Sequence, residues 1–372
     1  MSSILNNVEN ILRSASRIKN LLPNVRSNNR GRDEKPSYKD DYETSQSSTS
    51  TSSSSSTMTK RKFVKTTEHL SKDPIDFSGD FDFVECLGDR EDFNLTMQQP
   101  QKIAYDRQNN LIFVAENRHI IRIFVFNATT LDFLYNFELK ELDFAIDALE
   151  VDPKGDGIIV LQKTKLHKIS IDGRQRKWAV TLDSDMKDCT IDENGKIYCA
   201  RDSLYSGIQQ PSVCVVDSSN GKVLANVGQD MSGYCVAQKV SCICLNKDGN
   251  ICLSNSYTSE LTILKPNGKV VGTQQLPKLG AIESLKFDKN SNCIYAGYRN
   301  MNTCESNAIV IVHPDGSETM FNGNTIPNLG KAKNQHKFQG TYMDLTINST
   351  TGQLLLTNRI PDISYETVLV FK

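Results

Sequence analysis

The sequence predicts an all-β protein, a six-bladed β-propeller behind a disordered N-terminal tail that contains one short amphipathic helix. Three observations predict this fold. A group of short strands recurs six times, in units that begin at residues 101, 147, 187, 241, 283 and 343. This spacing is close to the roughly 40 to 50 residues typical of four-stranded propeller blades. An additional strand before the first unit can close the ring, and the residues before it are too polar to form a core.

The first strand of each unit follows one pattern: apolar residues at its third and fifth positions, and Asp or Asn at its sixth. The six strands read QKIAYD, DALEVD, KDCTID, SCICLN, ESLKFD and MDLTIN. A polar turn, often with Gly, leads to a second apolar strand and then a third, and a further hairpin leads to a fourth in most units. Because no blade can bury both faces of its sheet alone, each must pack on its neighbours.

The two ends of this region are predicted to meet. The sixth unit ends with its third strand at 368–372, and no residues remain for a fourth. The stretch FDFVECL at 81–87 precedes the first unit and has no other obvious partner. We expect 81–87 to pair beside 367–371 as the outer strand of the last blade. The propeller is therefore predicted to span residues 76–372.

The first unit comes close to a more specific pattern, Pro-x-x-Ile-Ala-x-Asp followed by Ile-x-Val-Ala and Asn-x-Arg-Ile-x-Val-Phe, with a small departure in spacing at His119 and Ile120. The matching residues are Pro100, Ile103, Ala104, Asp106, Leu111, Ile112, Val114, Ala115, Asn117, Arg118, Ile121 and Ile123. In these residues the chain resembles the NHL-repeat family of six-bladed propellers. Glu116 stands where the family usually has Asp, and the later units lose the Asp-x-x-Asn-x-Arg segment. The resemblance implies a propeller over about residues 81–372 and, as in some members, RNA binding on a basic face.

The tail begins with an amphipathic helix, predicted over residues 1–23. Its apolar stripe recurs every three or four residues and consists of Ile4, Val8, Ile11, Ala15, Ile18 and Leu22. Three heptads make a marginal helix, so the stripe needs a partner. We favour a coiled coil or a groove on another protein. A membrane surface remains an alternative because basic residues flank the stripe. A mitochondrial import signal remains another because acidic residues are scarce. The helix can also dock on the chain's own globular domain.

Residues 24–75 are predicted to be a disordered linker. They include TSQSSTSTSSSSSTMTKRK at 44–62, which is too polar to bury the apolar surface that would offset the entropy lost on folding. The linker offers many serines for phosphorylation.

Composition narrows the class of protein. The 43 Lys and Arg nearly balance the 44 Asp and Glu, but the basic excess lies in the tail and the propeller is acidic. This distribution disfavours a nucleic-acid-binding domain. The ten cysteines include no Cys-x-x-Cys pair, so we expect buried, reduced thiols, with Cys242 and Cys244 on the same side of one strand. No apolar run approaches the ~20 residues of a membrane span, and the N-terminus lacks a signal peptide, which favours an intracellular, cytoplasmic protein.

Long connections are predicted to gather on one face. They lie at 201–212, 298–307, 322–342 and 358–367, whereas the turns expected on the opposite face are short. The candidate partner-binding residues on and beside them are Tyr205, Gln209, Tyr257, Tyr298, Arg299, Met301, Lys331, Lys333, Lys337, Arg359 and Tyr365. Tyr, Arg and Met are types that protein interfaces favour. We therefore predict a surface that binds a protein partner.

An enzymatic alternative rests on Asp147, Asp188, Glu283 and Asp344, which lie near the starts of inner strands. Some six-bladed propellers of other families are metal-dependent lactone or ester hydrolases, and such oxygen ligands suit calcium. These acids do not share one position in the unit, however, and hydrogen bonds between blades explain them more simply. We expect no catalytic residues, metal or cofactor, and predict a non-enzymatic interaction or scaffold protein. RNA binding through Lys331, Lys333 and Lys337 and hydrolysis are the alternatives.

Overall fold

The computed structural model describes most of the propeller. The described residues are 73–75, 77–79, 81–87, 97, 99–117, 120–142, 145–201, 211–231, 233, 235–237, 239–255, 258–289, 291–299, 308–322, 344–358 and 367–372. The helix predicted over 1–23 and the linker up to residue 72 lie outside them. In the described part, no helix is long and apolar enough to cross a membrane.

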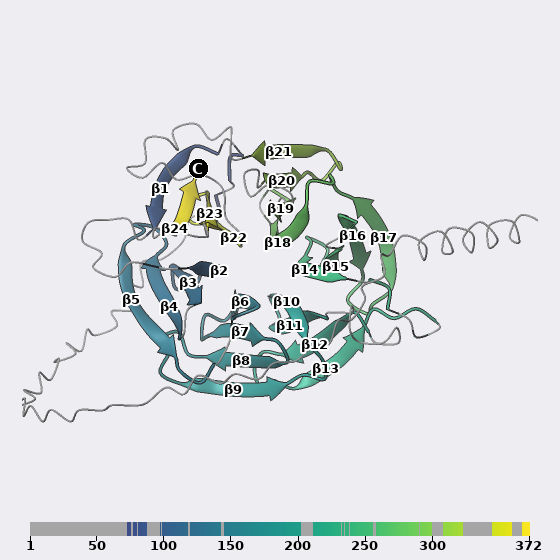
Figure 1. Ribbon diagram of the computed structural model, residues 1–372, viewed down its shortest axis with the longest axis horizontal. Helices are drawn as coiled ribbons and strands as arrows, with labels where there is room; N and C mark the ends of the chain where they lie inside the picture. The colour runs from purple at the N-terminus through teal and green to yellow at the C-terminus, as the bar shows by residue number, and fades with distance from the viewer. Residues whose placement is uncertain are drawn as a thin grey trace, which may run out of the picture. The chain divides into compact units, whose positions relative to one another are not determined.

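Six four-stranded antiparallel sheets form a ring of blades, as the sequence predicted (Figure 1). Blade 1 comprises β2 (Pro100–Asp106), β3 (Leu111–Asn117), β4 (Ile121–Asn127) and β5 (Phe133–Leu139). Blade 2 comprises β6 (Ala148–Val151), β7 (Ile158–Gln162), β8 (Lys165–Ile169) and β9 (Arg176–Thr181). Blade 3 comprises β10 (Met186–Ile191), β11 (Lys196–Arg201), β12 (Val213–Asp217) and β13 (Val223–Val227).

The second half of the ring repeats this arrangement. Blade 4 comprises β14 (Val240–Leu245), β15 (Ile251–Asn255), β16 (Glu260–Leu264) and β17 (Val270–Gln275). Blade 5 comprises β18 (Ala281–Asp288), β19 (Cys293–Arg299), β20 (Ala308–Val312) and β21 (Glu318–Asn322). Blade 6 comprises β22 (Leu345–Asn348), β23 (Gln353–Asn358), β24 (Thr367–Phe371) and β1 (Phe83–Leu87), in that order from the axis outwards.

The ring closes through β1, which pairs antiparallel with β24 and so confirms the predicted pairing of the chain's two distant segments (Figure 1). Phe83 lies opposite Phe371, and Leu87 lies opposite Val368. Just outside the strands, the backbone N–H groups of Asp82 and Lys372 donate to each other's carbonyl oxygens, at 3.1 and 2.9 Å. Blade 6 therefore needs both ends of the domain to be complete.

The core lies between neighbouring blades rather than within one sheet. Between blades 1 and 2, for example, Phe113 and Val125 pack with Leu149 and Val160, all of them buried. Alternate residues of each strand face opposite neighbours because side chains alternate along a strand. The third and fifth positions of a first strand, such as Leu149 and Val151 on β6, therefore face the same neighbouring blade.

Most of the described cysteines belong to this core. Every cysteine in the described part of the chain is free, and all but Cys235 are buried. Cys242 and Cys244 share one interblade cluster with Cys252, which confirms that they face the same side of β14. The neighbouring Cys252 thiol, together with burial, raises the pKa of Cys244 well above its ordinary value, so the thiol stays protonated at neutral pH.

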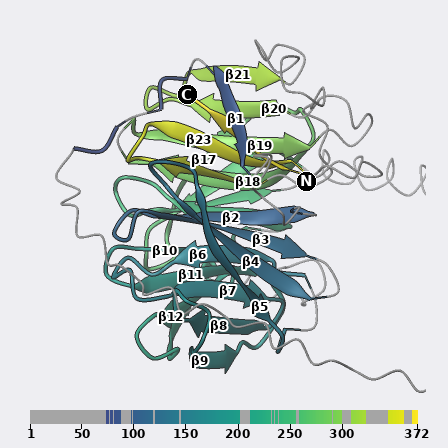
Figure 2. The same ribbon diagram turned by 90° about the vertical axis from the view of Figure 1, so that its left-hand side faces the viewer.

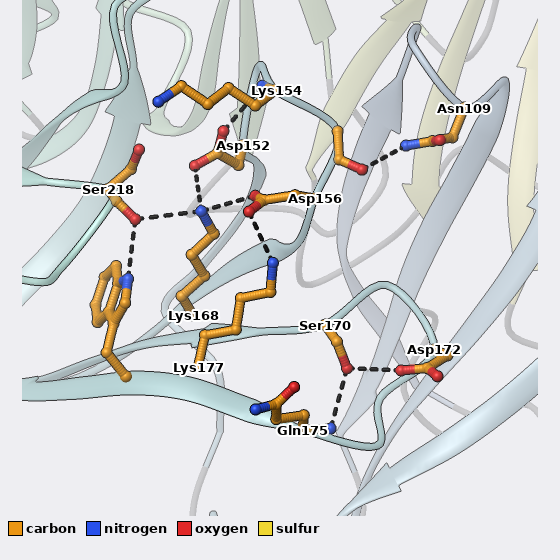
Figure 3. Close-up of polar contacts among 12 residues, drawn as sticks. Asn109, Asp152, Lys154, Asp156, Lys168, Ser170, Asp172, Gln175, Lys177 and Ser218 are labelled. Atoms are coloured by element: carbon orange, nitrogen blue, oxygen red, sulfur yellow. Dashed lines mark hydrogen bonds and ion pairs between the residues drawn. The ribbon is translucent and has the colours of Figure 1, made fainter.

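A buried lysine links blades 2 and 3 at the turns of the ring (Figure 3). Lys168 Nζ donates to Asp152 Oδ2 at 2.7 Å and to the backbone carbonyl of Ser218 at 3.2 Å, and it lies 2.7 Å from Asp156 Oδ1. The same carbonyl accepts a hydrogen bond from the indole N–H of Trp178 at 2.9 Å. Burial lowers the pKa of Lys168, but its bonds to Asp152 and Asp156 outweigh this effect, and the pKa lies above its ordinary value. Lys168 therefore stays charged.

Replacement of this lysine tests the link. Lys168→Met leaves the carboxylate of Asp152, which is fully buried, without its cation, so we expect the free energy of unfolding to fall by about 3–5 kcal/mol. Lys177→Met is the matched control, because Lys177 pairs with the half-exposed Asp156 at 2.7 Å, and it should cost less than about 1 kcal/mol. Urea unfolding followed by Trp178 fluorescence measures both. Equal losses for the two variants would contradict this assignment.

A histidine in blade 2 is buried without compensation. His167 on β8 is only 4% exposed, and neither ring nitrogen has a hydrogen-bond partner among the described residues. Burial, followed by the nearby charges of Arg176 and Lys165, lowers the pKa of His167 to about 4. The histidine is therefore neutral in the folded protein well below the pH at which it is protonated in the unfolded chain.

This difference predicts how stability depends on pH. Between about pH 4 and pH 6.5 the unfolded chain binds the proton more readily, so the free energy of unfolding should fall as the pH is lowered through this window. The contribution of His167 should reach at most about 3 kcal/mol. Urea unfolding of wild type and His167→Leu at pH 4.5 and pH 7.5 measures it. His167→Leu should be more stable relative to the wild type at pH 4.5 than at pH 7.5, because only the wild type has this group to protonate on unfolding. A difference that is the same at both pH values would refute the prediction.

Candidate functional site

The strand order determines where each connection begins and ends. The strands run from one face of the ring to the other, as the side view in Figure 2 shows. In every blade the second and third strands join at one face, and the fourth strand returns to that face before the next blade begins. The four longest connections, between β1 and β2, β11 and β12, β13 and β14, and β21 and β22, all join strand ends there. The predicted long connections between β19 and β20 and between β23 and β24 join strand ends on the same face. We call it the long-loop face.

Most of the predicted partner-binding residues lie outside the described part of the chain. These are Tyr205, Gln209, Tyr257, Met301, Lys331, Lys333, Lys337, Arg359 and Tyr365. Arg299 is the last residue of β19. Tyr298, beside it, is fully buried and packs in the core between blades 4 and 5. Its ring belongs to the core because β19 is a central strand of its sheet, so Tyr298 does not offer its side chain to a partner in this structure.

The inner strands surround the axis of the ring, and their polar residues are largely committed to one another. The carboxylate of Asp188, on β10, accepts a hydrogen bond from the N–H of Ile243 in blade 4 at 3.0 Å. The carboxylate of Asp344, before β22, accepts one from the N–H of Ile103 in blade 1 at 3.0 Å. The expectation that these acids bond between blades is confirmed at these two junctions.

The other two acids of the predicted set are placed differently. Asp147 accepts from the N–H of Lys163 at 2.6 Å, a bond within blade 2. Glu283 lies on β18 and is partly buried. Among the described residues, no group of three or more His, Cys, Asp or Glu side chains is arranged to hold a metal ion. The four acids therefore do not converge on one point.

Two ion pairs join blades that are not neighbours. Lys286 on β18 and Glu150 on β6 are 2.5 Å apart, although their blades, 5 and 2, face each other across the axis. Burial lowers the pKa of Lys286, but Glu150 and then Asp344 raise it more, so its pKa lies well above the ordinary value. In the turns of the opposite face, Lys289 of blade 5 lies 2.6 Å from Glu193 of blade 3. Ion pairs thus link blades that are not neighbours at two levels below the long-loop face.

Lys102 on β2 is the second lysine near the axis. Burial lowers its pKa, but Asp344 of blade 6 and Asp188 of blade 3 outweigh this effect, and the pKa is raised. Since charges from blades on different sides of the ring act on one ammonium group, Lys102 belongs to the same electrostatic cluster as Lys286. Both lysines remain protonated at neutral pH.

The ion pair across the axis can be measured by a double-mutant cycle. Lys286→Met and Glu150→Gln each leave one charge unpaired in a partly buried place, whereas the double variant leaves neither. The two losses in unfolding free energy should therefore exceed the loss of the double variant by about 1–3 kcal/mol. The same cycle on Lys289 and Glu193, which are both exposed, should give less than about 1 kcal/mol. Additive losses at Lys286 and Glu150 would show that the pair contributes nothing.

Sequence reasoning missed Lys102, Glu150 and Lys286. A signal was present, because Glu150 and Lys286 both occupy the fourth position of their first strands, in the second and fifth units. In a ring of six, these two units are diametrically opposite. Opposite charges at equal positions of opposite blades could therefore have predicted the pair.

Comparisons with known proteins support the fold. No family model and no curated protein matches the chain. Among solved structures, a streptogramin B lyase aligns with a TM-score of 0.50 and 12% identity, over 77% of this chain and 97% of that one. Hydrazine synthase of Kuenenia stuttgartiensis aligns with a TM-score of 0.49 and 11% identity, over 73% and 80%. A Bacteroides caccae protein of unknown function gives 0.49 and 18%, over 70% and 83%. At these identities the likeness to the lyase shows the fold alone: the chain is a six-bladed β-propeller.

Proposed function

We propose that this propeller is a non-enzymatic interaction protein that binds a partner protein on its long-loop face. The observation that carries the proposal is the position of the four longest connections, whose strand ends all lie on that face. The turns of the opposite face are short and bond to neighbouring blades, as the side chain of Asn109 does to the carbonyl of Gly155 at 2.7 Å. Long loops held on a rigid scaffold commonly carry binding residues.

The chemistry near the axis supports binding rather than catalysis. The carboxylates of Asp188 and Asp344 accept backbone N–H groups of the next blade, and Glu150 binds Lys286. Groups used in this way hold the ring together. We therefore assign the acids near the axis to the scaffold, and the alternative of a metal-dependent hydrolase is the weaker one.

The pattern in blade 1 favours kinship with NHL-repeat propellers, some of which bind RNA. The connection between β21 and β22 contains Lys331, Lys333 and Lys337, and this basic segment is the observation that keeps RNA as a second candidate. The N-terminal stripe that includes Ile11 and Ile18 would dock on a different protein. The linker then ties two binding events together and raises the effective concentration of one partner near the other.

Site-specific photo-crosslinking in cells tests the proposal. A photoreactive phenylalanine analogue replaces Tyr205 or Tyr365 on the long connections, Ile11 in the N-terminal stripe, or the exposed Lys247 or Asn267 in turns of the opposite face. We expect protein adducts from Tyr205 and Tyr365, a different adduct from Ile11, and none from Lys247 or Asn267. Because only the probe position differs, the turn variants control for expression and nonspecific labelling.

The outcomes separate the candidates. Equal labelling from the two faces would contradict the assignment of the long-loop face. RNA adducts that disappear in a Lys331→Glu, Lys333→Glu, Lys337→Glu variant would support the RNA-binding alternative instead, since phosphate contacts depend on these positive charges.

A further inference from the structure

Asp188 and Asp344 are structural twins in opposite blades. Each occupies the second position of its unit, in blades 3 and 6 respectively. Each carboxylate accepts the N–H of the third-position residue in the next blade, Ile243 or Ile103, at 3.0 Å. Each also accepts the N–H of the residue that follows it, at 2.9 Å for Asp188 and 3.0 Å for Asp344. The two junctions, between blades 3 and 4 and between blades 6 and 1, are thus built alike.

They differ in one hydroxyl group. Asp344 also accepts a hydrogen bond from Ser284 Oγ at 2.8 Å, and Ser284 is the second-position residue of the preceding blade. The equivalent residue before Asp188 is Ala148, which is buried and has no hydroxyl. Among the described residues, Asp188 therefore has two donors where its twin has three. In the described part of the chain, no ammonium or guanidinium group lies within ion-pair distance of its carboxylate.

Several titratable groups face Asp188 at longer range. Across the axis these are Lys102 on β2, Lys286 on β18 and Asp344. On the adjacent strands they are Glu150 of β6, which is neutralised by Lys286, and the thiols of Cys242 and Cys244 on β14, which are protonated at neutral pH. The two lysines favour the ionised carboxylate and Asp344 opposes it. None of these groups replaces the missing hydroxyl donor.

We propose that the junction between blades 3 and 4 is a proton-sensitive contact, closed most firmly when Asp188 carries a proton and loosened when Asp188 loses it. An ionised carboxylate with too few donors gains hydration when the junction opens, whereas a protonated one gains little. The twin junction between blades 6 and 1 has its third donor and lacks this response. The fold therefore contains one reference junction and one responsive junction.

The electrostatics agree with this geometry. Burial raises the pKa of Asp188 to about 7, and the charges of Lys102 and Lys286 and the bond from Ile243 offset only part of the effect. In an open junction the carboxylate meets water and its pKa returns towards its ordinary value of 3.8. The closed state thus binds the proton more tightly between these two values, so a rise in pH from about 4 to about 7 favours opening, and the effect levels off above pH 7.

The junction lies under the proposed binding surface. β10 and β14 start at the long-loop face, and the connection between β11 and β12, which contains Tyr205 and Gln209, belongs to blade 3. Loosening at Asp188 would change how blade 3 is held against blade 4. A change of pH near neutrality would therefore act on one sector of that face and leave the sector of blades 6 and 1 unchanged.

Amide hydrogen exchange on the full chain tests the proposal directly. The N–H of Ile243 reports the responsive junction, and the N–H of Ile103 in the same sample reports the reference junction. After correction for the intrinsic pH dependence of exchange, we expect the protection of Ile243 to fall about tenfold between pH 6 and pH 8, and that of Ile103 to stay constant. Constant protection of Ile243, or an equal fall at both amides, would overturn the proposal.

Two reciprocal variants identify the cause. Ala148→Ser supplies the missing hydroxyl next to Asp188 and should remove the pH response of Ile243. Ser284→Ala removes the hydroxyl next to Asp344 and should give Ile103 a response of the kind seen at Ile243 in wild type. Asp188→Asn carries no titratable group at the junction and should also leave the protection of Ile243 independent of pH. A response of Ile243 that persists in both Ala148→Ser and Asp188→Asn would show that another group titrates.

Discussion

The pairing of β1 with β24 is the constraint on which the propeller depends. Every blade covers its two faces with its neighbours, so an open ring would leave an interblade surface exposed to water. Residues 83–87 and 367–371 are separated by almost the whole domain, and bringing them together costs loop-closure entropy before any contact repays it. Burial of apolar side chains on β24 offsets this entropy, because four of its residues are fully buried: Val368, Leu369, Val370 and Phe371. The blades therefore stabilise one another only once the ring is closed.

Within the closed ring, apolar packing and polar contacts have different roles. The apolar clusters are chemically alike at every junction and would allow several arrangements of similar sheets. The polar contacts are individual: Lys168 joins blades 2 and 3, Asp188 joins blades 3 and 4, and Lys286 reaches across the axis. Each is made with one particular neighbour. Such contacts fix which blade lies where, at some cost in desolvation.

The sequence predicted the fold well because its signals are local. Alternation with a period of two and Gly-containing turns define the strands, and their repetition defines the blades. The site was harder to predict because it depends on distances around a ring. Lys286 and Glu150 are 136 residues apart in sequence and meet only because blades 5 and 2 are opposite. Tyr298 shows a different limit of the sequence. It was predicted to lie on the binding surface because it stands beside a long connection, but residues of blade 4 bury its side chain.

The two faces and the axis of the ring have separate roles. The axis is crossed by Lys286 with Glu150, and the turns of one face by Lys289 with Glu193, so these regions are occupied by the chain's own charges. The blades differ most on the long-loop face, where the lengths of their connections vary most. Single side chains also distinguish the blades: Ser284 donates a hydrogen bond to Asp344, whereas Ala148, at the equivalent position, has no hydroxyl group to donate to Asp188. Six blades can share one backbone and still differ in chemistry, because each junction is set by a few side chains that the fold itself leaves free to vary.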